Sequence, residues 1–293
     1  MFGVIARHWR GGSGVWMGVL LSLLIPAVVF FGMLYSQAYL ELYSGPQVRI
    51  AAVIAGASLA TVAALWLLVG NWRAASKAKA PRRWLLTRGF SRLVALAGAA
   101  ATCLPWLFIA PQVVNNMQGI LADFEDNGKK ATYTLAVDGD RLEVTGFVTW
   151  SLQAAFSQAL DNNPGVRLVV LNGPGGNATV GLRLAGIIKS RHLDTMTTRF
   201  CASSCTMMFA AGQRRLLQDG AQLAFHEVFA NGGGKSGWNP IVDLIQARYR
   251  ATWRADGIPD DFIDHVFRTP GDQAWIPSNE ELTAANVVTE VTN

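Results

Sequence analysis

Long uncharged stretches dominate the first third of the chain, whereas apolar and polar positions alternate over much shorter distances in the rest. Three stretches without charge have their apolar centres at residues 15–33, 50–69 and 93–110. A helix needs about 20 apolar residues to cross roughly 30 Å of hydrocarbon, so each stretch predicts a transmembrane helix. Three such runs favour a membrane domain over the buried helices of a soluble protein, and they fit a cleaved signal peptide poorly.

The first 110 residues carry ten Lys or Arg and a single acid, Glu41. The basic charge therefore accompanies the most apolar part of the chain, which indicates a lipid bilayer as partner and no nucleic acid. Basic residues precede the first stretch and crowd the segment 73–92. By the positive-inside rule these two segments are cytoplasmic. Three spans then place the chain after residue 111 on the periplasmic or extracellular side of the inner membrane.

We accordingly expect a membrane domain over residues 1–110, a connector over 111–131 and an α/β domain over 132–293. Asp138-Gly139 between two β-rich runs predicts a hairpin. Strand-like and helix-like runs then alternate, at 150–163 (helix), 167–171 (strand), 179–189 (helix) and 195–199 (strand). This alternation is typical of α/β domains.

Three short motifs in the α/β part carry candidate chemistry. The glycine-rich NGPGG occupies residues 172–176, the small-residue segment CASSC occupies 201–205, and His226 closes a short apolar run. A hydroxyl at a helix start, an imidazole after a later strand and glycine amides are the parts of a nucleophilic hydrolase. No phosphate-loop Lys follows the glycines, and the cysteines and histidines lack zinc-ligand spacing, so we expect no cofactor or metal.

The order and spacing of NGPGG, CASSC and the AFH ending at His226 resemble the ClpP/crotonase superfamily, over about residues 132–289. The resemblance implies a ClpP/crotonase-like spiral of ββα units, here preceded by three transmembrane helices. It implies a membrane-anchored serine peptidase that acts without a cofactor on polypeptide substrates at the outer side of the membrane. Members of the superfamily often assemble into rings or trimers, so a homo-oligomer is expected as well.

The same resemblance assigns the nucleophile to Ser203 and the general base to His226, 23 positions later. Ser204 is the alternative nucleophile, and both serines would also suit the N-cap of the following helix. His226 would be equally at home as a structural residue. In this assignment the amides of Gly175 or Gly176 and of Ser204 form the oxyanion hole, unless the glycines only make a tight turn.

The orienting acid that the resemblance implies is Asp272, which is one residue out of the family's register. Three other carboxylates are alternatives, namely Asp260, Asp261 and Asp264. Asp272 would also suit an exposed turn after Pro270-Gly271. A triad is recognised by geometry, and the spacing does not choose among these residues.

Cys201 and Cys205 flank the two serines. Four residues apart across a strand-to-helix turn, they come within disulfide reach, and thiols outside the cytoplasm tend to be oxidised. Two buried free thiols and a cysteine nucleophile are the alternatives, and the residues leave all three open.

Two further functions fit the same residues. One is a non-catalytic binding or assembly module of the membrane that keeps the fold. The other is a crotonase-type enzyme acting on acyl-CoA, against which the outward topology argues because coenzyme A is cytoplasmic.

Overall fold

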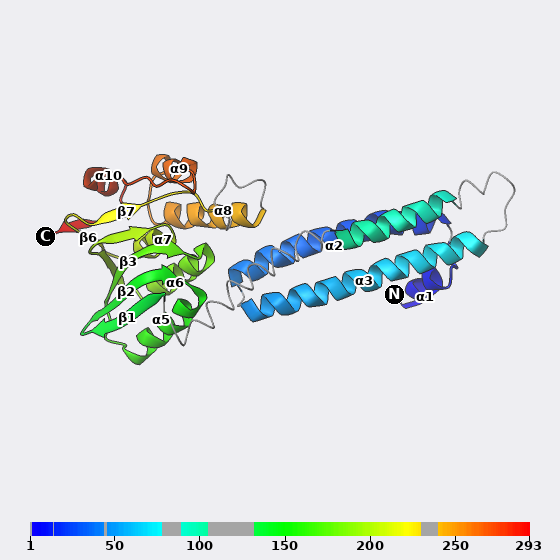
Figure 1. The fold of residues 1–293 in the computed structure, drawn as a ribbon, viewed down its shortest axis with the longest axis horizontal. Helices are drawn as coiled ribbons and strands as arrows, with labels where there is room; N and C mark the ends of the chain where they lie inside the picture. Colours follow the sequence, from blue (N-terminus) through cyan, green and yellow to red (C-terminus); the bar gives the residue numbers. More distant parts are fainter. Residues whose placement is uncertain (1, 14, 44–45, 78–88, 105–131, 230–239) are drawn as a thin grey trace. The chain divides into compact units, whose positions relative to one another are not determined.

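The structure is a computed structural model that describes residues 2–13, 15–43, 46–77, 89–104, 132–229 and 240–293 (Figure 1). The chain divides into two compact units, Met1–Gly119 and Ile120–Asn293. The predicted connector, 111–131, lies outside the described residues, so its boundaries stay a prediction.

The described part of the N-terminal unit is helical. It contains α1 (Phe2–Trp9), α2 (Val15–Tyr43), α3 (Pro46–Lys77) and a shorter apolar helix over Gly89–Leu104. The Asn71 amide on α3 donates to Ser22 Oγ on α2 at 2.8 Å, and both side chains are buried. A Cβ on Gly98 would lie 2.9 Å from the Cβ of Ser22, so a glycine lets the shorter helix approach α2 closely.

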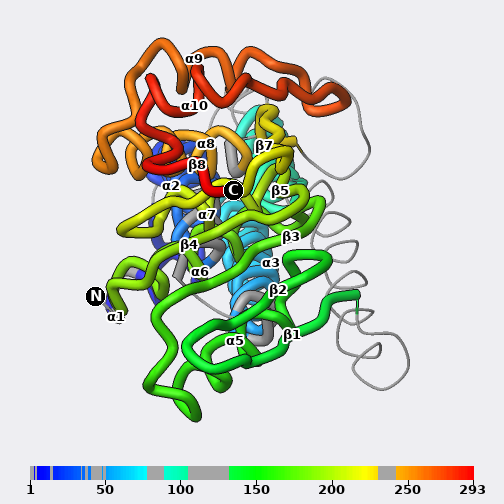
Figure 2. The backbone as a smooth tube through the Cα atoms, turned by 90° about the vertical axis from the view of Figure 1, so that its left-hand side faces the viewer, coloured from blue at the N-terminus to red at the C-terminus, as the bar shows by residue number. Residues whose placement is uncertain are grey.

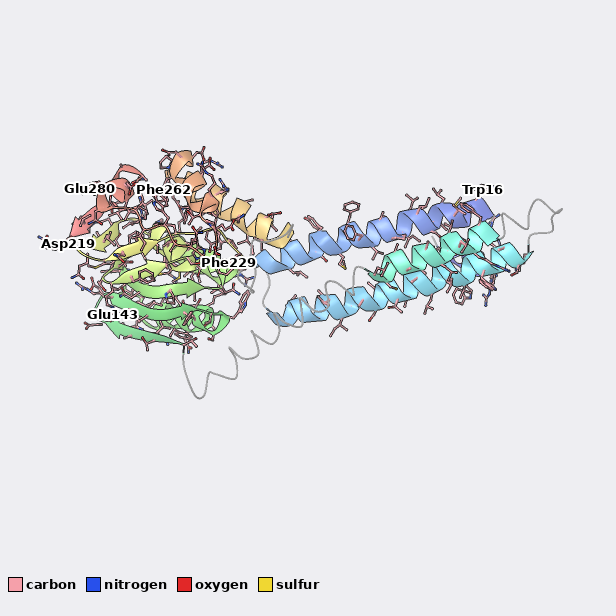
Figure 3. All side chains as sticks on the ribbon, turned by 45° about the horizontal axis from the view of Figure 1, so that its top comes forward. Trp16, Glu143, Asp219, Phe229, Phe262 and Glu280 are labelled. Carbon is pink, nitrogen blue, oxygen red and sulfur yellow. A yellow bond between two sulfur atoms is a disulfide. The ribbon has the colours of Figure 1, made fainter. Side chains whose placement is uncertain are left out.

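Two helices of this unit are long and apolar enough to cross a membrane. Their windows, Trp16–Met33 and Ala51–Lys77, both have a mean hydropathy of 2.2, yet only 22% and 17% of these residues are buried. Trp16, at the start of α2, is 68% exposed (Figure 3). Of the three predicted spans, two therefore correspond to helices that are long and apolar enough to cross a membrane, and the third does not among the described residues. Only residues 93–104 of that stretch are described, in the shorter helix, and 105–110 lie outside the described residues.

The C-terminal unit contains an eight-stranded sheet with helices between the strands. In chain order its elements are β1 (Tyr133–Asp138), β2 (Arg141–Val148), α5 (Trp150–Asn162), β3 (Leu168–Gly176), α6 (Ala178–Ser190), β4 (Asp194–Thr197), β5 (Phe200–Ala202), α7 (Ser204–Ala210), β6 (Arg215–Gln218), β7 (Gln222–Ala224), α8 (Pro240–Ala255), α9 (Asp260–Arg268), α10 (Asn279–Ala284) and β8 (Glu290–Thr292).

The strand order along the main path is β1-β2-β3-β4-β6-β8, and its first four strands can be followed in Figure 2. β1 and β2 form the predicted antiparallel hairpin, which turns at Gly139 with φ +59°, and the other strand pairs are parallel. β5 and β7 pair with each other beside this path and join it where Cys201 pairs with Gly173. The mixed α/β sheet agrees with the predicted fold class at this coarser level.

One face of the sheet is packed against helices. The core between sheet and helices includes Leu142 and Leu171 from the strands, Leu152 and Phe156 from α5, Leu184 and Ile188 from α6, and Met207 and Phe209 from α7. Thr149 caps α5 by accepting from the amide of Leu152, and Asn177 caps α6 by accepting from Val180. These caps fix where two of the helices leave the sheet.

The glycine-rich segment is extended, although we expected it to be a turn after a strand that ends at Leu171. β3 runs through Gly176, because Gly173 pairs with Cys201 on one side and Gly175 pairs with Phe147 on the other. Side chains do not fit there, since a Cβ on Gly173 would lie 2.0 Å from the carbonyl oxygen of Gly146. The glycines therefore permit close packing of neighbouring strands as well as an unusual backbone.

Candidate active site

Ser203 has a strained backbone. It joins β5 to α7 with φ 55° and ψ −126°, a region that non-glycine residues rarely occupy and that costs about 1–3 kcal/mol. Its side chain is half-buried and makes no capping hydrogen bond to α7. Ser203 therefore does not serve as an ordinary N-cap, and its hydroxyl is left for another task.

The backbone around Ser203 is held from two directions. The Ser203 amide donates to the carbonyl of Ala224 on β7 at 3.0 Å, which continues the pairing of β5 with β7. The Ser203 carbonyl accepts from the amide of Thr206 at 2.9 Å and from its hydroxyl at 2.6 Å. These bonds fix the main chain of the turn without engaging the Ser203 side chain.

Gly175 lies directly against this turn. A Cβ on Gly175 would lie 2.5 Å from the carbonyl oxygen of Ala202 and 2.9 Å from the amide nitrogen of Ser204. Its φ of +88° also favours glycine. Gly176, with φ +145°, faces β2 instead, since its Cβ would meet the carbonyl oxygen of Val148 at 2.5 Å. Of the two glycines, Gly175 is thus the one in contact with the serine turn.

Ser204 is buried, with 1% of its surface exposed, and its Oγ has no hydrogen-bond partner among the described residues. It faces α6, because a Cβ on Gly181 would lie 2.8 Å from the Cβ of Ser204. The nearby Tyr249 hydroxyl donates to the carbonyl of Ala178, and burial raises its pKa, so it stays protonated. The Ser204 hydroxyl is therefore inaccessible. The backbone amide of Ser204 lies at the first position of α7, where a helix offers no acceptor for it.

His226 follows β7, the strand beside β5. Its Nδ1 lies 2.7 Å from the carbonyl oxygen of Glu227, which only accepts, so Nδ1 carries the proton of the neutral ring. Nε2 is then left with its lone pair, which is the tautomer that a general base needs. The ring also packs against Phe229, with centroids 5.3 Å apart.

The residue before His226 anchors it. Phe225 is 1% exposed and packs edge-on against Trp253 and Phe262, with centroids 6.0 and 5.4 Å away. Its main chain exchanges hydrogen bonds of 2.8 and 2.9 Å with Trp275. The buried Phe225 thus fixes the backbone next to His226.

The register brings the serine and the histidine to the same end of adjacent parallel strands. Ala202 of β5 pairs with Ala224 of β7, so Ser203 and His226 are one and two residues beyond this pair. Neighbouring strands lie about 5 Å apart, so the backbone segments that carry the two residues leave the sheet side by side. Among the described residues, no hydrogen bond joins Ser203 Oγ to His226 in this structure.

Asp272 lies in an exposed turn and makes no hydrogen bond or ion pair with any described residue. Its chain neighbour Gly271 packs on Phe229, whose ring touches His226, so the backbone of this turn comes near the imidazole. The carboxylate itself does not hold the ring. Two of the alternatives bind arginines instead, with Asp264 paired to Arg250 and Asp260 to Arg254. The contact to Glu227 is one that the sequence analysis missed, because a backbone carbonyl has no sequence signature.

Cys201 and Cys205 form a disulfide with their Cα atoms 5.4 Å apart. Both residues are buried, and both sulfurs are engaged in the bond, so neither is available as a nucleophile in this form. The bond encloses Ala202, Ser203 and Ser204.

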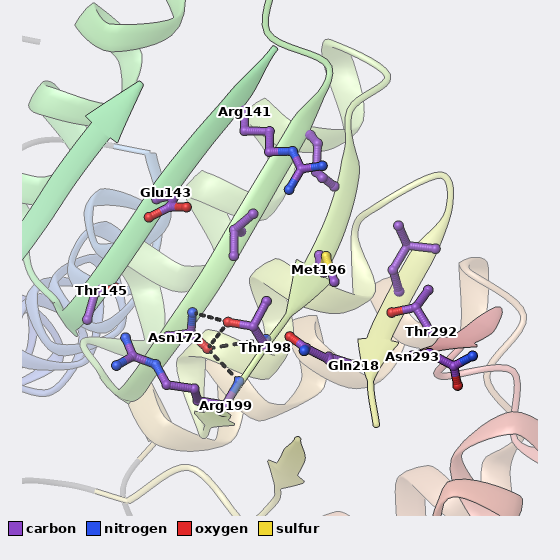
Figure 4. Close-up of a pocket in the computed structure, with 13 residues that line it drawn as sticks. Arg141, Glu143, Thr145, Asn172, Met196, Thr198, Arg199, Gln218, Thr292 and Asn293 are labelled. Carbon is purple, nitrogen blue, oxygen red and sulfur yellow. Dashed lines mark hydrogen bonds between the residues drawn. The ribbon is translucent and has the colours of Figure 1, made fainter. Parts of the chain in front are cut away.

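A hollow of about 640 Å³ lies on the sheet face opposite the helix-packed core (Figure 4). Asn172 lines it and links β3 to the start of β5. Its Oδ1 accepts from the amide of Arg199 at 2.9 Å, and its Nδ2 donates to Thr198 Oγ1 at 2.9 Å. The asparagine of NGPGG thus holds the two segments that carry Gly175 and Ser203, a role that the sequence analysis did not assign.

The solved structures that are similar to this chain include the following two. A mutant of ClpP1 from Listeria monocytogenes is 17% identical, with a TM-score of 0.43, and the match covers 53% of this chain and 93% of that one. An enoyl-CoA hydratase/isomerase from Marinobacter aquaeolei is 10% identical, with a TM-score of 0.39, covering 55% and 70%. No model of a protein family matches the chain, and no curated protein does. Because both TM-scores are below 0.5, neither similarity supports an argument about the candidate site, which is described from its own geometry alone.

Proposed function

We propose that this chain is a membrane-anchored serine hydrolase of the peptidase type, acting on polypeptides by acyl transfer to Ser203. The observation that carries the proposal is the backbone of Ser203, which is held at φ 55° while its hydroxyl makes no capping bond. Strain of this kind persists only where the surrounding structure maintains it, and it is typical of nucleophiles on a strand-to-helix turn.

In the proposed reaction, Ser203 Oγ attacks the carbonyl carbon of the scissile bond and passes its proton to Nε2 of His226. The Glu227 carbonyl keeps the proton of His226 on Nδ1 and stabilises the imidazolium that forms. The imidazolium then protonates the leaving amine, and water hydrolyses the acyl-enzyme with His226 again as base.

The negative charge on the carbonyl oxygen needs hydrogen-bond donors. The amide of Ser204 at the first position of α7 is one, since a helix N-terminus favours an anion. A glycine amide from Gly175 or Gly176 is the second, and the contact between Gly175 and the serine turn supports Gly175. The absence of a Ser203–His226 hydrogen bond is compatible with this scheme, because catalytic bonds often tighten only when substrate binds.

The membrane-bound location rests on α2 and α3, whose apolar side chains are mostly exposed. We propose that these helices and the third apolar stretch cross the inner membrane, with the N-terminus in the cytoplasm and the C-terminal unit outside it. Substrates would then be membrane or secreted polypeptides close to the bilayer. Assembly into a homo-oligomer remains part of the proposal through the family resemblance alone.

The direct test is labelling of the full-length protein in detergent with a fluorophosphonate probe, which reacts with activated serines. We expect labelling of the wild type, loss of labelling in Ser203→Ala and His226→Ala, and retention in Ser204→Ala. Ser204→Ala is the matched control, because the Ser204 hydroxyl is buried and its removal breaks no hydrogen bond in the part of the chain that the structure describes. Labelling that survives in Ser203→Ala, or no labelling of folded wild type, would overturn the proposal.

A non-catalytic binding module is the second candidate. The specific observation in its favour is that Ser203 Oγ, His226 and Asp272 are not joined by hydrogen bonds. In that case a strain lacking the gene would be rescued as well by Ser203→Ala as by the wild type, and the folded protein would not react with the probe.

A further inference from the structure

The Cys201–Cys205 disulfide encloses the candidate nucleophile. It joins the middle residue of β5 to the second residue of α7, and Ser203 lies at the centre of the three residues between them. Cys201 is fully buried and Cys205 is 4% exposed. Cys201 also pairs with both Gly173 and Leu223, so one end of the bond is fixed in the sheet between β3 and β7.

The other end of the bond is fixed in the first turn of α7. The amide and hydroxyl of Thr206, the residue after Cys205, both bind the Ser203 carbonyl. The disulfide therefore closes a small covalent ring around a residue whose φ of 55° is unfavourable for serine. Such a conformation lasts only while its surroundings leave it no alternative, and the ring is the covalent part of those surroundings.

The shortness of the ring matters. A disulfide that closes a long loop stabilises a fold by restricting the unfolded chain, and this effect falls as the loop shortens. With three residues between the cysteines, this bond restricts little of the unfolded chain. Its main effect is expected to be local, on the conformation of the turn.

We propose that the Cys201–Cys205 disulfide positions the Ser203 hydroxyl, so that the hydrolase is reactive in its oxidised form and loses reactivity when a dithiol reduces the bond. The inference rests on the proposed function of Ser203. Reduction transfers two electrons and two protons from the dithiol, which becomes a cyclic disulfide, and leaves thiols at Cys201 and Cys205. The turn is then free to relax, with Ser203 leaving its positive φ. Thiol–disulfide exchange with oxidised glutathione reverses the step.

The experiment measures fluorophosphonate labelling of the full-length protein in detergent, as a maximal rate of inactivation and a probe affinity. Dithiothreitol is expected to lower the maximal rate roughly tenfold to a hundredfold, as for a nucleophile displaced by about an ångström. Probe affinity is expected to stay unchanged, and oxidised glutathione is expected to restore the rate. A merely structural bond would not separate rate from affinity in this way.

Two variants complete the test. The double variant Cys201→Ala/Cys205→Ala is expected to have the low maximal rate of the reduced protein, both with and without dithiothreitol. Cys103→Ala, which removes the free cysteine, is expected to respond to dithiothreitol like the wild type. Near-UV circular dichroism monitors folding throughout.

An unchanged rate in both the reduced protein and the double variant would refute the positioning role. If labelling is lost together with the near-UV signal, the positioning role is also refuted, because the bond would then stabilise the whole fold. If neither the oxidised nor the reduced wild type reacts, the proposed function fails, and this inference fails with it.

Discussion

The imidazole of His226 is held by the backbone carbonyl of the very next residue, Glu227, at 2.7 Å from Nδ1. No carboxylate among the described residues takes that position. Because a peptide carbonyl accepts but never donates, the contact selects the neutral tautomer whose proton is on Nδ1. The third partner of the candidate site is thus part of the main chain.

Because this contact does not involve Asp272, substitutions of His226 and of Asp272 are expected to have different effects. His226→Ala is expected to lower the fluorophosphonate labelling rate by about 10²–10⁴, the usual contribution of a general base. Asp272→Asn is expected to change the rate by no more than about threefold, because this side chain is exposed and has no partner among the described residues. Glu227→Ala, which keeps the carbonyl, serves as the control. Equal losses in His226→Ala and Asp272→Asn would return the orienting role to Asp272.

Ser203 should illustrate a conflict between stability and activity. Ser203→Gly is expected to raise the free energy of unfolding by about 1 kcal/mol, because glycine accepts φ 55° readily and this relief exceeds its larger unfolded-state entropy. Ser203→Ala keeps the strain and is expected to match the wild type in stability. Both variants should lose labelling. Chemical denaturation measures the difference, and a glycine variant less stable than the alanine variant would show that the turn is unstrained.

Gly175 should tolerate no side chain. Gly175→Ala is expected to cost about 1–3 kcal/mol of stability from overpacking and to abolish labelling, because the new Cβ would lie 2.5 Å from the Ala202 carbonyl oxygen. Gly186→Ala is the matched control. Gly186 lies within α6, and among the described residues a Cβ there would meet nothing within 4 Å beyond the adjacent backbone of its own helix, so alanine should stabilise the helix by up to about 1 kcal/mol. Similar behaviour of the two variants would contradict the close contact at Ser203.

Asn172 lines a hollow, but we expect its side chain to contribute to the stability of the fold. Asn172→Ala removes the acceptor of the Arg199 amide and the donor to Thr198, and is expected to cost about 2–3 kcal/mol. Asn172→Asp keeps the acceptor and should cost less. Thermal unfolding ranks the two variants by stability. An Asn172→Ala variant as stable as the wild type would show that water replaces both hydrogen bonds.

The proposed topology can be tested by fusions. Alkaline phosphatase, which is active only outside the cytoplasm, is expected to be active when fused after residue 293 and inactive when fused after residue 85, in the basic segment. The full-length protein is expected to resist alkaline extraction from membranes. Activity of the fusion at residue 85, with none at 293, would invert the topology and favour a cytoplasmic site.

Much of the α/β unit could be predicted from its residues, because the patterns involved are local. Asp138-Gly139 predicts the hairpin through the φ of its glycine, and the apolar spacing of 150–163 predicts α5. The extended glycine segment could not be predicted in this way. Whether NGPGG turns or continues a strand depends on Cys201 and Phe147, which pair with it from distant parts of the chain.

The candidate site shows the same division. A serine before a helix and a histidine after a strand are visible in the sequence, since their side chains are chemically distinctive. The choice of Ser203 over Ser204 depends on which hydroxyl faces α6, and that is a property of packing. The hold on His226 could not be foreseen at all, because every residue has a carbonyl.

The parallel pairing of β3, β5 and β7 also has a consequence for when the site comes into existence. Gly175, Ser203 and His226 belong to three segments that meet only through contacts between residues far apart in the chain. Such non-local contacts form late and slowly during folding. A partly synthesised or partly unfolded chain therefore carries the candidate residues separately, with no assembled site. Under the proposed function, hydrolysis begins only when the sheet is complete.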